Sequence, residues 1–414
     1  MLINPITQWI KLGIRFPLMV LALVSLTMGC ASAQTGESTV TVPQDGKWSD
    51  RMALSIIKRS PEAWAMRDYK LLDSPQWAYT YGLTLYSMQK AYERTGDDRY
   101  LEYGKVYVDQ LIDDQGQIKN YHIWDFNIDD VNAGKLLFLL YEKYQDERYL
   151  TAMQTLRKQL DWQPRTRSGG LWHKRIYPWQ MWLDGLYMGA AYWAQYAATF
   201  EDTDESFSDI AHQFKLIESK TRDPESGLLY HGWDESTLQT WADDETGLSE
   251  HFWSRAMGWY AMALVDTLDF FPEDHPDRQA LIAILNRLVV ALEKVQHESG
   301  LWYQVTDQGD RYGNYLEASG SSMFVYAMAK GVRMGYLPEK FQAVAEKGFD
   351  GLIQELVDVE PNGEIHLTQI CGSAGLGNDP YRPGTFEYYV GEAIRVNDPH
   401  GTGPFILAAL ELDR

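Results

Sequence analysis

Two segments of the sequence place acidic residues near aromatic neighbours and before apolar runs. Residues 125–132 include Asp129, and residues 172–188 include Asp184 after four aromatic and three basic residues. Both carboxylates precede apolar runs of helical spacing, so each is either a helix N-cap or an inward-facing functional group. An apolar environment favours the protonated form of a carboxyl group, which suits general acid catalysis. We therefore take Asp184 and Asp129 as candidates for acid–base chemistry.

Two later segments place a histidine or an arginine between aromatic residues. His231 follows Tyr230, and Arg255 lies between Trp253 and Trp259. A guanidinium in such surroundings either forms a buried ion pair or grips the carboxylate and hydroxyl groups of a ligand. A lone histidine is more often structural than functional, so both interpretations stay open for these two side chains.

A repeated unit indicates the architecture that positions these residues. Tyr92 and Arg99 recur as Tyr141 and Arg148, with a period of 49 residues, between segments of helical apolar periodicity. A repeat of this length is typical of stacked helical hairpins. We predict helices over residues 79–94, 98–113, 131–145, 148–160, 180–199, 206–219, 254–270, 277–296, 319–335, 339–356 and 402–412.

About six hairpins can form either an open solenoid or a closed toroid. Short stretches of the pattern Gly-Leu-(Trp/Leu)-(His/Tyr) recur between the hairpins, beginning at Gly170, Gly227 and Gly300. In a closed ring these stretches and their aromatic side chains would converge on one mouth. The sequence therefore favours an all-α toroid.

The N-terminal residues 1–33 are predicted to be an export signal, because a basic region precedes an apolar run too short to span a bilayer. Two cleavage interpretations stay open. A lipobox-like sequence would place a lipid anchor on Cys30, and ordinary cleavage would occur after Ala33. The protein is accordingly expected in the periplasm or on the outer membrane of a bacterium. Residues 34–50 resemble a flexible tether, and residues 51–414 are predicted to form one domain.

Composition limits the partners and cofactors of the protein. The formal net charge is −21, so the general surface would repel nucleic acid. If Cys30 is lipidated or removed, Cys371 is left alone and no internal disulfide can form. No cluster of residues has the spacing of metal ligands, so we predict neither a metal nor a cofactor.

Together the motifs resemble glycoside hydrolase family 105, the unsaturated rhamnogalacturonyl hydrolases, and more distantly family 88. The resemblance runs from about residue 77 to the C-terminus. It rests on ordered matches at Trp77-Ala78-Tyr79 with Gly82, Asp129 with Asn132-Ala133-Gly134-Lys135, Trp172-His173-Lys174, residues 180–188, residues 230–234, Arg255 with Gly258-Trp259, Glu317 with residues 319–323, and residues 401–405.

The resemblance implies an (α/α)6 barrel that removes a 4,5-unsaturated uronic acid from the non-reducing end of lyase-generated oligosaccharides. It also implies that a carboxylic acid protonates C4 of the C4=C5 double bond, that water adds at C5, and that the resulting hemiketal rearranges. By resemblance, Asp184 is the general acid, and Asp129 is the second acidic residue, which would hold sugar hydroxyls. The residues implied to bind the anionic substrate are Tyr79, His173, Lys174, Trp182, His231, Trp253, Arg255 and Trp259.

The identity of the substrate stays open at this stage. Residues 254–259 read Ser-Arg-Ala-Met-Gly-Trp, where many family members resemble Gly-Arg-Gly-Asn-Gly-Trp. Rhamnose of pectic rhamnogalacturonan fragments and sulfated rhamnose of ulvan fragments are both compatible, with a polysaccharide lyase upstream. Two rival functions are a non-catalytic carbohydrate-binding lipoprotein and a polysaccharide lyase on the same fold, in which His231 would act as the base.

Overall fold

The computed structural model describes residues 40–67, 72–201 and 204–414. The predicted export signal of residues 1–33, including Cys30, and residues 34–39 of the predicted tether lie outside the described residues. No helix in the described part of the chain combines the length and apolar character needed to cross a membrane.

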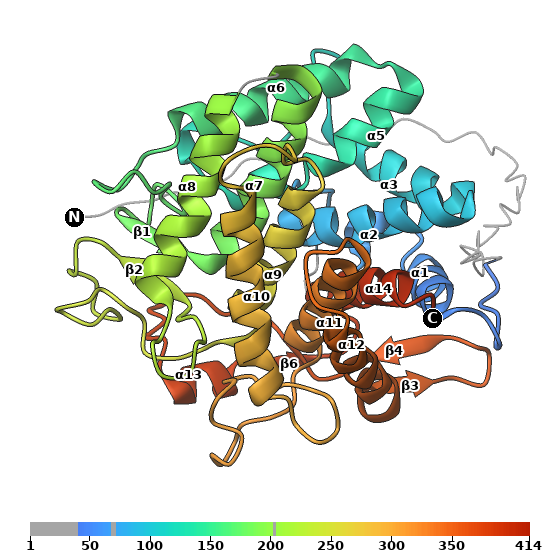
Figure 1. Ribbon diagram of the computed structural model, residues 1–414. Coiled ribbons are helices and arrows are strands. Elements are labelled where there is room, and N and C mark those ends of the chain that lie inside the picture. Colours follow the sequence, from blue (N-terminus) through green and yellow to red (C-terminus); the bar gives the residue numbers. More distant parts are fainter. Residues whose placement is uncertain (1–39, 68–71, 202–203) are drawn as a thin grey trace, which may run out of the picture. The chain divides into compact units, whose positions relative to one another are not determined.

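Six helical segments surround one axis, and each packs against the next (Figure 1). Because the last of them, α14, packs against the first, α2, the ring closes. The fold is therefore the predicted (α/α)6 barrel and not an open solenoid. In order around the ring, the segments are α2 (Tyr79–Thr95), α4 (Asp129–Asn132) continued by α5 (Lys135–Tyr144), α7 (Leu183–Tyr196), α9 (Ser254–Leu268), α11 (Ala318–Arg333) and α14 (Pro399–Glu411).

Six further helices cover this ring from outside, and each packs mainly against one inner helix. Five pairs are formed by helices consecutive in sequence. The sixth joins the two ends of the domain, because α1 packs against α14 (Figure 1, blue and red). The outer helices are α1 (Trp48–Arg59), α3 (Asp98–Leu111), α6 (Glu147–Trp162), α8 (Asp204–Thr221), α10 (Arg278–Lys294) and α12 (Lys340–Gly351).

Inner and outer helices differ in burial, as their positions require. All 15 residues of the inner helix α9 are buried, because ring neighbours and an outer partner enclose it. The outer helix α6 is amphipathic and buries only 7 of its 16 residues. The hydrophobic core therefore lies within the inner ring and between the two rings.

The 49-residue repeat marks the start of the outer helices α3 and α6. Asp97 and Asp146 are the N-cap residues, and each accepts a hydrogen bond from the backbone N–H two residues later. Arg99 and Arg148 pair with these carboxylates at nitrogen–oxygen distances of 2.6 and 2.7 Å. The recurring arginine therefore belongs to a helix-capping arrangement.

Short antiparallel strand pairs lie in the loops, and two of the predicted helices differ from the structure. Residues 180–182, predicted as helix, form β1, and α7 begins at Leu183. The predicted helix over 131–145 is interrupted between α4 and α5. The strand pairs are β1 (Gln180–Trp182) with β2 (Gly232–Asp234), β3 (Val357–Val359) with β4 (Ile365–Leu367), and β5 (Ile370–Cys371) with β6 (Ile394–Arg395).

The remaining helical segments are the 3-10 helices Ala63–Ala65 and Ile123–Asp125, the π-helices Ala197–Glu201 and Leu352–Leu356, and α13 (Phe386–Gly391).

The domain begins before the predicted boundary at residue 51. Helix α1 starts at Trp48, and Val42 is only 2% exposed. A Cβ at Gly363 would lie 2.5 Å from the Val42 carbonyl oxygen, so the two backbones are in close contact. The described part of the predicted tether therefore packs onto the domain. Its Ser-, Thr- and Gly-rich composition gave no sign of this contact.

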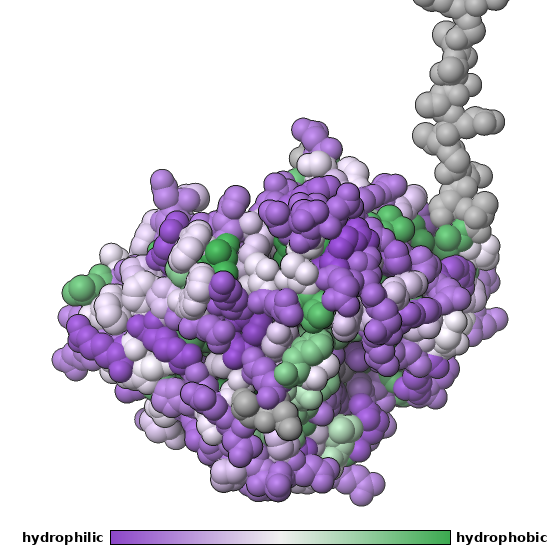
Figure 2. Space-filling view, turned by 90° about the horizontal axis from the view of Figure 1, so that it is seen from above, coloured by the Kyte–Doolittle hydropathy of each residue, from purple (hydrophilic) through white to green (hydrophobic). Residues whose placement is uncertain are grey.

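One face of the protein surface is predominantly hydrophilic. In the face shown in Figure 2, hydrophilic residues predominate and hydrophobic ones form small separate patches. This distribution agrees with the formal net charge of −21. Exposed aromatic side chains include Trp124 and Trp162, whose rings stack on each other with centroids 5.3 Å apart.

Candidate active site

The predicted site residues gather at the end of the barrel where the inner helices begin. Tyr79 is the first residue of α2, Asp129 is the first of α4, and Asp184 is the second of α7. Trp253 is the N-cap residue of α9. Neither carboxylate occupies the N-cap position of its helix, so the capping alternative is wrong for both.

A short strand pair brings Asp184 and His231 together. Trp182 of β1 is opposite Gly232 of β2, and the Leu183 N–H donates to the His231 carbonyl oxygen at 3.0 Å. As a result, Asp184 Oδ2 lies 3.2 Å from His231 Nε2. Among the described residues, neither atom has a well-formed hydrogen bond, although both are buried. This carboxyl oxygen therefore has unused hydrogen-bonding capacity beside the His231 nitrogen.

Asp129 has a different environment, because it is held by two basic side chains. Lys174 Nζ lies 2.5 Å from Asp129 Oδ2, and His173 Nε2 lies 3.3 Å from Asp129 Oδ1. Burial raises the pKa of Asp129, but Lys174 and His173 outweigh it, and the net pKa shift is downward. Burial lowers the pKa of His173 to about 4. Asp129 is thus an ionised acceptor at neutral pH, with Lys174 as its counter-ion.

Three nearly parallel rings lie beside these carboxylates. The centroids of His173 and Trp182 are 4.5 Å apart, and those of Tyr177 and Trp182 are 4.7 Å apart. Gly185 allows the close approach of His173 to α7, since a Cβ there would lie 3.1 Å from His173 Nδ1. Arg382 Nη2 donates to the Tyr177 hydroxyl at 2.7 Å. The rings therefore fix the orientation of His173 next to Asp129.

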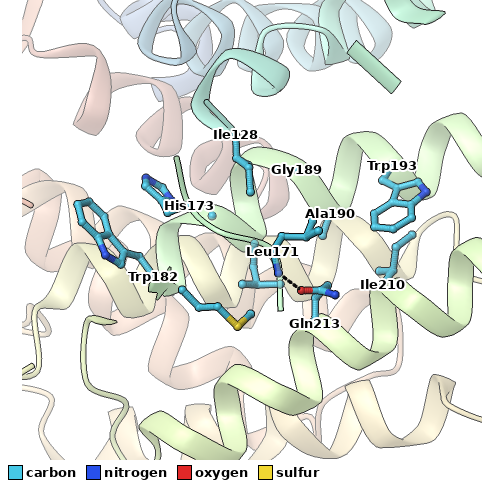
Figure 3. A pocket seen from close by; sticks show the side chains of 12 residues that line it. Ile128, Leu171, His173, Trp182, Gly189, Ala190, Trp193, Ile210 and Gln213 are labelled. Carbon is cyan, nitrogen blue, oxygen red and sulfur yellow. Dashed lines mark hydrogen bonds between the residues drawn. The ribbon is translucent and has the colours of Figure 1, made fainter. Parts of the chain in front are cut away.

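A small apolar cavity shares His173 and Trp182 with the site. Figure 3 shows these two rings at one side of the cavity and Trp193 and Ile210 at the other. Its volume is about 20 Å³, enough for about one water molecule and far too small for a sugar. The cavity is therefore a packing feature behind the site and not the substrate pocket.

Arg255 was predicted to bind substrate, with a buried structural role as the alternative, and its side chain makes several contacts within the protein. The side chain is 1% exposed. Its Nε donates to Ser319 Oγ at 2.8 Å, its Nη1 donates to the Gly372 carbonyl at 2.9 Å, and its Nη2 donates to the Cys371 carbonyl. Glu317 lies 3.6 Å from Nη2. Because all three nitrogens are used by the protein, Arg255 joins α9 to α11 and to the C-terminal segment.

Trp253 and Trp259 were also predicted to contact substrate, and the structure places both almost entirely inside the protein. Both are 1% exposed, so they offer almost no surface to a ligand. The Trp253 ring lies 4.8 Å from the His231 ring, and Trp259 packs edge-on against Tyr79 at 6.2 Å. The two indoles therefore support His231 and Tyr79 from behind.

Among the side chains that the sequence analysis missed, Tyr389 and His400 contact predicted site residues, and Asp398 holds His400. The Tyr389 hydroxyl lies 2.7 Å from His231 Nδ1. His400 Nε2 lies 2.8 Å from the Tyr79 hydroxyl, and His400 Nδ1 lies 2.6 Å from Asp398 Oδ1. The sequence Asp-Pro-His before the last helix could have indicated a capped helix that starts at Pro399 and not at residue 402.

The metal content of the site stays a prediction. Within the described ranges, no three or more His, Cys, Asp and Glu side chains are arranged to hold a metal ion.

Known proteins resemble this chain across the whole barrel. It matches the model described as Glycosyl Hydrolase Family 88 over residues 48–414, a span that contains every site residue named above. A solved structure from C. acetobutylicum, described as a glycoside hydrolase from family 105, is 48% identical, with 89% of this chain and 99% of that chain covered and a TM-score of 0.84. A curated protein of Agrobacterium fabrum is 36% identical over 230 residues, which is 54% of this chain and 97% of that protein. The unsaturated rhamnogalacturonyl hydrolase YesR of Bacillus subtilis is 30% identical over 258 residues, which is 61% of this chain and 70% of that protein.

Proposed function

Because this chain belongs to glycoside hydrolase family 105, a relative of family 88, it is a hydrolase, and we propose that its substrate carries a 4,5-unsaturated uronic acid. This sugar stands at the non-reducing end of an oligosaccharide generated by a polysaccharide lyase. The enzyme releases it by hydrating the C4=C5 double bond. Family membership favours this function over the two rivals, a binding lipoprotein and a lyase.

The observation that carries the proposal is the contrast between the two buried carboxyl groups. Asp129 is tied to Lys174 and stays ionised, so it suits the binding of sugar hydroxyls. Asp184 has no lysine or arginine partner among the described residues, and its Oδ2 atom is unsatisfied beside His231. Two carboxyl groups in such different environments can divide the work of acid and anchor.

In the proposed reaction, Asp184 gives its proton to C4 of the unsaturated uronic acid. A water molecule forms a bond to C5 and passes its own proton back to the Asp184 carboxylate. The resulting C5 hemiketal opens to a ketone, and the anomeric carbon then releases the remaining oligosaccharide. Since one group serves as acid and then as base, the spacing of two carboxylates does not determine the outcome.

We propose a uronyl-rhamnose linkage as the bond that is finally lost. The likeness to YesR supports a pectic rhamnogalacturonan fragment, and a sulfated ulvan fragment is the second candidate because the resemblance of the sequence fits either. The upstream lyase would act in the same compartment. We place that compartment in the periplasm or at the outer membrane, on the basis of the signal-like residues 1–33.

The test follows the ultraviolet absorbance of the double bond in lyase-generated pectic and ulvan oligosaccharides. Wild-type protein should abolish the absorbance of one of them, and Asp184→Asn should slow this loss by at least about 1,000-fold, because the proton donor is gone. Asp125→Asn is the matched control, since this nearby carboxylate is exposed and pairs with Arg175 at 3.4 Å.

Three outcomes would contradict the proposal. An Asp184→Asn variant as active as wild type would remove Asp184 from the reaction. A rise in absorbance with intact polysaccharide would indicate a lyase. Binding of the oligosaccharides without any change in absorbance would indicate the carbohydrate-binding protein.

A further inference from the structure

Tyr79 begins a buried chain of hydrogen bonds that leads away from the site. Its hydroxyl contacts His400 Nε2 at 2.8 Å, and His400 Nδ1 contacts Asp398 Oδ1 at 2.6 Å. His400 and Asp398 are each 1% exposed. Trp259 packs edge-on against both the Tyr79 and the His400 rings, with centroids 6.2 and 6.5 Å away. The geometry therefore fixes all three polar groups in one orientation.

The protonation states assign the direction of each hydrogen bond. Burial raises the pKa of Asp398, but His400 outweighs it and the net shift is strongly downward, so this carboxylate can only accept. His400 Nδ1 must therefore donate to it. Burial, and next the charge of Arg255, lower the pKa of His400 to about 4, so the ring is neutral and its Nε2 is an acceptor. The Tyr79 hydroxyl consequently donates its proton to His400.

Tyr79 also lies close to the two carboxyl groups of the site. Burial and then the charge of Asp129 raise its pKa, and Asp184 adds to the same effect. The phenol therefore keeps its proton and is not a base. With that proton committed to His400, only the lone pairs of the Tyr79 oxygen remain for a ligand.

We propose that Asp398 and His400 are positioning residues that make the Tyr79 oxygen a pure hydrogen-bond acceptor for a substrate hydroxyl. Together with the Asp129 carboxylate, Tyr79 then forms a pair of acceptors, which recognises neighbouring hydroxyl groups of a sugar. Acceptor-only substituents, such as a sulfate or a carboxylate, are disfavoured at this subsite. This inference deepens the proposed function and rests on it for the identity of the substrate.

A double-mutant cycle tests the proposal. Asp398→Asn keeps a side chain able to cap α14, but an amide can donate as well as accept, so the His400 tautomer is no longer fixed. We expect Asp398→Asn and Tyr79→Phe each to lower kcat/KM about fivefold, mainly through KM, as for one neutral hydrogen bond. In the double variant the loss should equal that of Tyr79→Phe alone. Losses that multiply, or an Asp398→Asn variant with wild-type KM, would overturn the proposal.

A second measurement does not depend on activity. Nitrogen-15 NMR of histidine-labelled protein, with His400 identified from a His400→Gln variant, reports which ring nitrogen carries the proton. At neutral pH, wild type should show Nδ1 protonated and Nε2 bare, and Asp398→Asn should lose this single tautomer. A protonated Nε2 in wild type would refute the proposal. If wild type leaves every unsaturated oligosaccharide intact, the proposed function fails, and the NMR result still decides the orientation of Tyr79.

Discussion

Replacement of Lys135 by methionine should stabilise the protein at neutral pH. Lys135 begins α5, is 3% exposed, and its Nζ has no hydrogen-bond partner among the described residues. Burial lowers its pKa from 10.5 to about 7, although the charge of Asp266 acts in the opposite direction. The rings of Tyr187 and Tyr86, with centroids 3.7 and 4.8 Å from Nζ, favour the charged form and offset part of this effect.

The size of the effect follows from these opposing contributions. The lowered pKa corresponds to about 5 kcal/mol in favour of the neutral amine, and the two rings offset about 2 kcal/mol of it. Methionine has a similar shape and carries no charge. We therefore expect Lys135→Met to raise the free energy of unfolding at neutral pH by about 3 kcal/mol.

The sign of the pH dependence is fixed by the same shift. Because the pKa of Lys135 is lower in the folded state, the unfolded state binds more protons between the two pKa values. Wild type therefore gains stability as the pH rises through this window, from about 7 to 10.5. The variant lacks this gain, so its advantage should fall to about 1 kcal/mol near pH 9.5.

Urea unfolding followed by tryptophan fluorescence, at neutral pH and near pH 9.5, measures both quantities. Lys330→Met is the matched control, because Lys330 is equally buried but lies 2.7 Å from Asp266 and 2.6 Å from Asp269. Its removal leaves a buried carboxylate unpaired and should lower the free energy of unfolding by about 3 kcal/mol or more. A Lys135→Met variant less stable than wild type, or an advantage independent of pH, would refute the reasoning.

Two further substitutions test the site and the barrel by urea unfolding. Lys174→Met should lower the free energy of unfolding by about 3 kcal/mol at neutral pH, because it removes the lysine counter-ion of the buried Asp129 carboxylate. The wild-type pair stabilises the fold above about pH 4 and weakens as Asp129 is protonated, so the loss of stability caused by Lys174→Met should shrink in acid. Adding Asp129→Asn to the Lys174→Met variant should recover most of the lost stability. Gly82→Ala should cost about 2 kcal/mol, since its Cβ would lie 2.6 Å from the Ala133 Cα where α2 crosses α4. Gly391→Ala, with no atom near its Cβ, is the control and should change little.

The helices and their order could be predicted because apolar periodicity reports burial directly. Residues 79–94 and 254–270 were predicted as helices, and the structure has α2 and α9 there. The strand β1 was missed because its three residues are buried and continue the apolar pattern of α7. Periodicity cannot distinguish such a short buried strand from a helical turn. Only pairing with β2, about fifty residues later, makes it a strand.

The candidate site was predicted less completely, because contacts between distant segments decide the role of a side chain. The sequence singled out Asp129, Asp184 and His231 from the residues next to them in the chain, although their partners in space are distant in sequence. It could not show that the Arg255 guanidinium donates hydrogen bonds to carbonyl groups more than a hundred residues away. Nor could it assign a role to His400, whose partner Tyr79 lies at the opposite end of the domain sequence.

The contacts that close the barrel also complete the site. Helix α14 joins the ring between α11 and α2, and α1 covers it from outside. The segment that leads into α14 supplies the Tyr389 hydroxyl to His231 and the Asp398–His400 pair to Tyr79. It also supplies the carbonyl groups that hold Arg255. An open ring would therefore contain both carboxyl groups but lack the partners that orient the side chains beside them. Closure of the barrel is thus a condition for activity as well as for stability.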